Sequence, residues 1–132
     1  MTTPGHHTVV SPARRIARGL ARRCVRCGAP GAFEGYFRLR ERCATCGYRP
    51  GAEEGFFLGV WVVNFAISEG LLFLTLFAYV VAMGATDGAV PVLPVLIVGL
   101  VFAVGAPVVF YPFSAGLWAG AVLVMHPERA RP

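Results

Sequence analysis

The chain has 132 residues, a net charge of +5 and a hydrophobic share of 56%. Charged residues make up only 14%, against about 25% in a soluble domain, which argues against an ordinary water-soluble globular protein. Ten of the twelve arginines precede Phe56, the other two follow Met125, and there is no lysine. Because the basic and apolar residues occupy separate segments, the composition predicts a small basic head joined to a membrane anchor.

Residues 1–22 are predicted to form a basic tail, disordered up to Pro12 and then either disordered or folded into a short amphipathic helix. In the second part, arginines surround Ile16 and Leu20, which lie one helical turn apart. Three roles are open for these arginines: a topogenic signal, docking on anionic lipid headgroups, or binding of nucleic acid. Nucleic acid is the least favoured partner, because no aromatic residues interleave with the arginines.

Residues 23–55 contain two Cys-x-x-Cys motifs, each followed by glycine, with 15 residues between Cys27 and Cys43. A Pro- and Gly-containing linker follows. This spacing predicts a four-thiolate zinc site, because one tight turn can aim both sulfurs of each pair at one ion. A head of some 30 residues also has too little core to fold without a metal or disulfides. The predicted ligands are Cys24, Cys27, Cys43 and Cys46.

Alternatives to a zinc site remain open. Residues 43–48 look like a rubredoxin-type knuckle, so iron is the alternative metal. Two disulfides, or a dithiol redox pair, are the alternatives to any metal. The first residues contain no apolar core of a secretory signal, so we expect a reducing compartment, in which paired thiols favour metal.

Between the two motifs, residues 36–40 alternate apolar and charged side chains. The alternation predicts a strand with Phe37 and Leu39 facing inward, and therefore a zinc-ribbon-like β module. The aromatic residues Phe33, Tyr36 and Phe37 are candidate contacts for a partner.

Residues 56–132 are predicted to form a transmembrane hairpin with a short cytoplasmic tail. Residues 56–83 exceed the roughly 20 residues that a helix needs to cross a bilayer, and a second span is placed at about residues 92–111. Residues 112–125 are expected to continue as a kinked extension or to lie along the membrane interface. Gly99 and Gly105 are candidates for close helix approach. The expected fold class is a mainly α membrane protein with an N-terminal β module.

The first span contains a few polar residues. Asn64, Ser68 and Thr75 fall on one helical stripe, and Glu69 is displaced from that stripe by about a quarter-turn. An ionised carboxylate is costly in a bilayer, so Glu69 is expected to be neutral or partnered. The stripe is explained either by interhelical packing or by a functional contact with a partner protein, a proton or a ligand.

The distribution of arginine also predicts the topology. Cytoplasmic flanks of spans carry the excess of Lys and Arg, and here both outer flanks are basic while the turn carries only Asp87. We therefore expect a multi-pass protein with both termini in the cytoplasm. An arginine-only set of cations suggests a bacterium, so the expected location is the bacterial inner membrane.

The pattern resembles the bacterial domain-of-unknown-function family 983. The resemblance covers roughly residues 23–125 and rests on both Cys motifs, the aromatic residues between them, and the Glu-Glu-Gly-Phe-Phe segment before the first span. One departure is Val25, where many members carry proline. The resemblance implies a Cys-rich head and a two-span hairpin. It assigns no activity, and it hints at respiratory-complex assembly.

No His–carboxylate cluster, serine triad or phosphate loop is present in the sequence, so an enzyme is not expected and no catalytic residue is assigned. The favoured function is a membrane adaptor or assembly factor with a membrane-protein partner. The alternatives are an iron-binding redox or metal-handling protein and, last, a tethered nucleic-acid binder. Candidate contacts inside the membrane are Asn64, Ser68 and Glu69.

Overall fold

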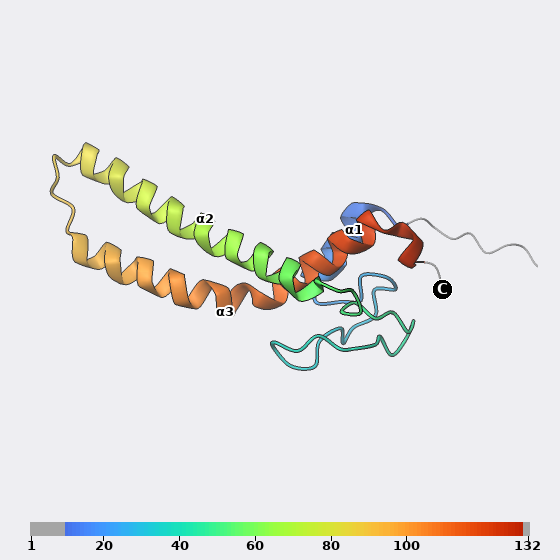
Figure 1. The fold of residues 1–132 in the computed structure, drawn as a ribbon. Helices are drawn as coiled ribbons and strands as arrows, with labels where there is room; N and C mark the ends of the chain where they lie inside the picture. The colour runs from blue at the N-terminus through green and yellow to red at the C-terminus, as the bar shows by residue number, and fades with distance from the viewer. Residues whose placement is uncertain (1–9, 131–132) are drawn as a thin grey trace, which may run out of the picture.

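The computed structural model describes residues 10–130, which contain three α-helices and one short 3-10 helix. The helices are α1 (Pro12–Leu20), α2 (Phe56–Ala85) and α3 (Val92–Met125), and the 3-10 helix is η1 (Pro127–Ala130). Helices α2 and α3 form a long antiparallel hairpin, and α3 continues beyond the start of α2 toward α1 and the cysteine-containing segment (Figure 1). Of the tail that the sequence predicts up to Pro12, residues 1–9 lie outside the described residues.

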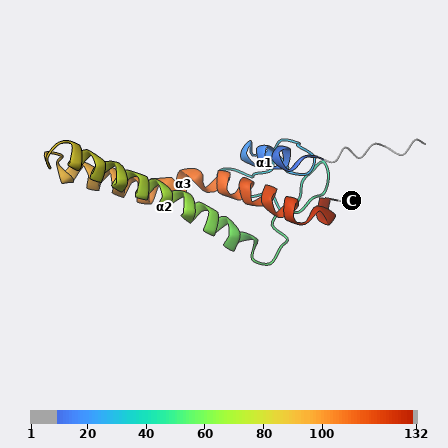
Figure 2. The same cartoon turned by 90° about the horizontal axis from the view of Figure 1, so that it is seen from above.

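Helix α1 forms where the sequence allows a short amphipathic helix. The Ser11 hydroxyl caps it by accepting a hydrogen bond from the Arg14 N–H at 3.4 Å, and Pro12 occupies the first turn, where its missing N–H costs nothing. Its buried residue is Gly19, and α1 lies alongside the second half of α3 (Figure 2). Helix α1 is therefore part of a packed head, which consists of residues 10–55 together with the second half of α3.

Helices α2 and α3 are both long and apolar enough to cross a membrane, as the sequence predicts. Only 6% of the most apolar stretch of each helix is buried, whereas a core helix of a soluble protein would be mostly buried. The tight turn between them places Asp87 at φ 53° and Gly88 at φ 81°. The hairpin thus exposes a large continuous apolar surface, which water-soluble monomers rarely do.

The second half of α3 forms the core of the head. Residues 112–125 continue α3 without interruption, and many of them, such as Ser114 and Leu123, are buried against the rest of the head. The interfacial alternative for this segment stays a prediction. Val25 of the first Cys motif and Phe56 of α2 share a core cluster with Ala119 and Leu123 of α3. The head is therefore built on the same helix that forms half of the hairpin.

Helices α1 and α3 approach one another at two glycines. A Cβ atom built on Gly116 would lie 2.0 Å from the carbonyl oxygen of Gly19, so neither position can carry a side chain without moving a helix. The Arg15 guanidinium donates to the Leu123 carbonyl at 2.6 Å across the same contact. By contrast, a Cβ on Gly105, a predicted site of close approach, would meet nothing within 4 Å.

The predicted β module is not found. Among residues 10–130 there is no strand, only one isolated antiparallel bridge between Phe33 and Leu39. The segment between the motifs is short and turns at Gly35 (φ 87°), and a two-stranded hairpin alone is marginal in water. Leu39 packs against the core as predicted, but Phe37 is 54% exposed, so its predicted inward orientation is wrong.

Candidate metal centre

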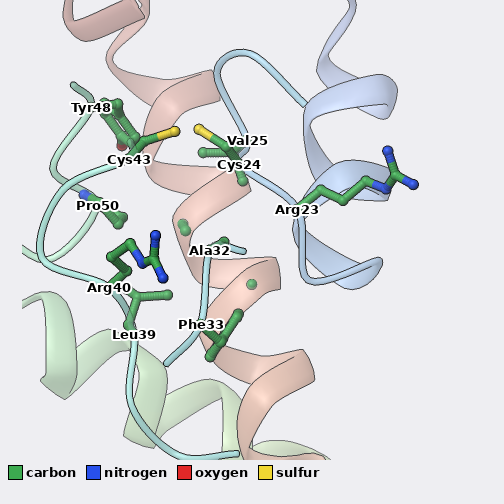
Figure 3. A pocket seen from close by; sticks show the side chains of 12 residues that line it. Arg23, Cys24, Val25, Ala32, Phe33, Leu39, Arg40, Cys43, Tyr48 and Pro50 are labelled. Atoms are coloured by element: carbon green, nitrogen blue, oxygen red, sulfur yellow. The ribbon is translucent and has the colours of Figure 1, made fainter. Parts of the chain in front are cut away.

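The structure brings the four predicted cysteines together. Their Sγ atoms all lie within 4.8 Å of one another. The Cys24 and Cys46 sulfurs are 3.7 Å apart, and the Cys27 and Cys43 sulfurs are 3.8 Å apart, so each close pair joins the two motifs. Figure 3 shows the sulfurs of Cys24 and Cys43 pointing toward each other beside α3.

The two motifs fold in the same way. In each, the glycine N–H donates to the carbonyl of the first cysteine: Gly28 to Cys24 at 2.8 Å and Gly47 to Cys43 at 2.9 Å. Both glycines have positive φ, 81° and 69°, a conformation that side chains disfavour. The backbone can then curl around the sulfurs, and the Ala29 N–H lies 3.5 Å from the Cys27 sulfur. The local repeat in the sequence is thus a structural repeat.

The geometry fits one tetrahedral metal ion. Zinc–thiolate bonds are about 2.3 Å long, which separates the sulfurs of a tetrahedral site by about 3.8 Å. The two close sulfur pairs, at 3.7 and 3.8 Å, match that edge. Four sulfurs would close the coordination shell, which is typical of a structural site. Iron in the same ligand set fits equally well, so the identity of the metal is not determined.

The thiols differ in their readiness to lose a proton. Burial raises the pKa of the Cys24 thiol from 9.0 to about 12, although backbone N–H groups of its own turn act in the opposite direction. Burial also acts to raise the pKa of Cys43, but N–H donors of its turn and the neighbouring thiols outweigh it and lower the pKa to about 6. Burial raises the pKa of Cys46. A cation would hold all four as thiolates.

The centre is fixed to the head on one side and open on the other. Cys24 is 5% exposed and precedes the core residue Val25, whereas Cys27 is exposed. A small apolar pocket beside Cys24 and Cys43 is lined by α3 at Gly116 and Ala119 (Figure 3). Any metal held here is therefore rigidly placed relative to the hairpin.

Asn64 and Ser68 lie between α2 and α3 and are each 6% exposed. The Asn64 Nδ2 donates to the Pro107 carbonyl at 2.9 Å, and the Ser114 hydroxyl donates to the Asn64 Oδ1 at 3.2 Å. Ser68 donates to the Asn64 carbonyl. These contacts are within the chain, as the packing interpretation expects.

Glu69 is placed differently. Its side chain is exposed on the outer face of α2, and within residues 10–130 the structure gives its carboxylate no hydrogen bond or ion pair. Of the predicted intramembrane polar contacts, Glu69 is thus the residue available to another molecule.

Several residues that pack the helices around the centre and along the hairpin were missed by sequence reasoning. Gly19, Gly116 and Gly120 allow α1 to meet α3, and Ser114 completes the Asn64 network. The signal was present as small residues at positions 114–116 and 119–120 of an otherwise bulky helix. Such small residues permit close helix approach, but only the tertiary contact identifies the partner helix.

No protein-family model, curated protein or solved structure matches the chain. The resemblance to the domain-of-unknown-function family 983 therefore stays a prediction that rests on the motifs alone.

Proposed function

We propose that this protein is a non-enzymatic membrane adaptor or assembly factor, in which a zinc-loaded four-cysteine head is held rigidly on a two-span hairpin. The observation that carries the proposal is the sharing of α3: its first part pairs with α2, and its second part forms the core beneath Cys24 and Cys43. A closed four-sulfur site leaves no coordination position for a substrate. What remains is a rigid surface at a fixed distance from the hairpin, which suits recognition.

The hairpin is proposed to span the bacterial inner membrane with both termini in the cytoplasm. The exposed apolar surface of α2 and α3 supports insertion, and the arginines of the head and tail support the orientation. In this arrangement the turn with Asp87 faces outward, and the cysteines face the reducing cytoplasm. The family resemblance adds a respiratory complex as the partner to test first.

The partner is proposed to be a membrane protein that contacts α2 at Glu69. An exposed carboxylate about four turns into an apolar helix is costly next to lipid, unless it is neutral or a partner supplies a cation or hydrogen-bond donor. Ser68, one residue away, is buried and satisfied by its own helix, so it does not compete for this partner.

The test is photo-crosslinking in native membranes, with the reactive residue at Gly70, which neighbours Glu69 and has open space around it. We expect a specific membrane-protein adduct that Glu69→Gln diminishes. Thr75→Val is the matched control, because Thr75 hydrogen-bonds only to the Leu71 carbonyl of its own helix. An adduct that survives Glu69→Gln would remove Glu69 from the proposed interface, and the absence of any specific adduct would contradict the adaptor role.

One observation favours the alternative, an iron-binding redox or metal-handling protein. Cys27 is exposed, so one edge of the centre is open to an exchanging ligand or an electron donor. Iron in this site would colour the protein and give a reversible one-electron potential. Either signature at stoichiometric level in protein purified from its native membranes would replace the adaptor by the redox function.

A further inference from the structure

The loop between the two Cys motifs carries two exposed aromatic rings at its tip. The loop is closed by a hydrogen bond from the Glu34 N–H to the Arg38 carbonyl at 2.8 Å and turns at Gly35. Tyr36 is 41% exposed and Phe37 is 54% exposed, although their rings contact each other edge to face. Exposed adjacent aromatics on a closed loop are a costly arrangement in water.

The loop is fastened in place on both sides. The Tyr36 hydroxyl donates to the Val109 carbonyl at 2.6 Å, and the Phe37 ring lies 5.6 Å from the Tyr111 ring. On the other side, the Arg22 guanidinium donates to the Gly35 carbonyl at 2.7 Å and lies over the Tyr36 ring. The loop is therefore preorganised.

The position of this contact along the hairpin is informative. Helix α3 rises from Val92 to Tyr111 over about 20 residues, or roughly 30 Å, which is the thickness of the bilayer hydrocarbon. The Asn64 bond to the Pro107 carbonyl sets the register of the hairpin and puts Trp61, 67% exposed, near the level of the loop. Trp61, Tyr111 and the loop therefore lie at one level of the hairpin, where the boundary of the bilayer is expected. Membrane proteins carry belts of Trp and Tyr at this position.

We propose that residues 34–38 form a membrane-contacting loop, whose Tyr36 and Phe37 rings lie in the headgroup–acyl boundary of the bilayer that the hairpin spans. The inference rests on the proposed function, because it needs the hairpin to be inserted. Arg38, which follows Phe37 and is exposed, then lies at the level of the lipid phosphates. The head is held against the bilayer surface by this loop as well as by α3.

Two observations favour lipid over a protein as the occupant of this surface. The exposed rings are continuous with the exposed apolar face of α3, since they contact it at Val109 and Tyr111. The loop also places the cation of Arg38 directly after the rings of Tyr36 and Phe37. This combination suits the boundary between acyl chains and phosphates. Figure 1 shows the loop running back beneath α3 toward the hairpin, away from the free end of the head.

The experiment uses single-tryptophan forms of the full chain, reconstituted with metal in vesicles of phosphatidylcholine and anionic phosphatidylglycerol. One form keeps Trp61 alone, through Trp118→Phe. The second carries Phe37→Trp with Trp61→Phe and Trp118→Phe. The third carries Glu128→Trp in the same background, as a head control beyond the end of α3. Metal content verifies that each variant is folded.

The readout is the loss of fluorescence when the phosphatidylcholine carries bromine atoms on its acyl chains. The inference predicts quenching of Trp at position 37 that matches Trp61 and is stronger with bromines near the headgroup than near the chain end, with position 128 unquenched. Quenching of Trp61 but not of position 37 would overturn the membrane-contacting loop and leave the proposed function standing. Absence of quenching at Trp61 would overturn both.

Discussion

At the scale of residues, the two cysteines of the first motif are expected to contribute unequally to metal binding and to the stability of the head. Cys24 is buried beside the core residue Val25, whereas Cys27 is exposed at the open edge. We expect Cys24→Ser to lose the metal and lower the thermal unfolding temperature of the head. Cys27→Ser should keep a weakened metal site, because water can take the fourth coordination position. The loss of metal affinity should exceed the roughly 10–100-fold that is typical when a residue hydrogen-bonded to a metal ligand is mutated. Metal analysis with calorimetry compares them; equal effects would contradict this asymmetry.

Proton release accompanies metal binding. With its pKa raised to about 12, the Cys24 thiol is protonated at pH 7, whereas Cys43, with a pKa of about 6, is mostly thiolate already. Binding must displace the Cys24 proton, so metal affinity rises with pH and falls in acid. Titration of metal-free protein with zinc in weakly buffered solution should release at least one proton per ion at pH 7. Binding without proton release would contradict these protonation states.

At the scale of elements, the contact between α1 and α3 depends on glycine. We expect Gly116→Ala to force the helices apart, because its Cβ would lie 2.0 Å from the Gly19 carbonyl, with a cost in the free energy of unfolding of about 1–3 kcal/mol. Gly70→Ala in α2 is the control, since a Cβ atom built on Gly70 would meet nothing within 4 Å. Protease cleavage of α1 measures the loss of packing, and an unchanged rate in Gly116→Ala would contradict the contact.

The linker between the head and α2 is expected to contribute little to holding the head on the hairpin. Because α1 and the first Cys motif pack on α3, inserting about 15 flexible residues at Ala52 is expected to leave metal content and the protection of α1 from hydrogen exchange unchanged. If a flexible linker alone held the head, the insertion would weaken any contact made jointly by head and hairpin. A loss of α1 protection after the insertion would show that the linker holds the head.

The sequence predicts some elements well, for physical reasons. The length of α2 and the start of α3 follow from apolar runs, and the gathering of Cys24 with Cys46 follows from motif spacing, since both signals are local. The contact of Gly19 with Gly116 is not predictable in this way, because it joins segments far apart in the chain. The missing strand has a related cause: Leu39 finds its packing partner in a helical core rather than in a sheet.

At the scale of the whole molecule, the proposed topology puts the head and the turn on opposite sides of the membrane. Cysteine introduced by Thr86→Cys, with the four native cysteines replaced by serine, should react with a membrane-impermeant maleimide added from outside. Thr86 is exposed in the turn, so access is not limited by protein. Labelling that requires permeabilised membranes would mean that the hairpin is inverted or does not span.

The central claim is a single four-sulfur metal site on the rigid head of this hairpin. X-ray absorption at the zinc edge, on protein purified under reducing conditions from its native membranes, tests it most directly. We expect one zinc per chain, surrounded by four sulfurs at about 2.3 Å. Fewer than four sulfurs around the metal, or metal-free protein with its cysteines joined as disulfides, would contradict it.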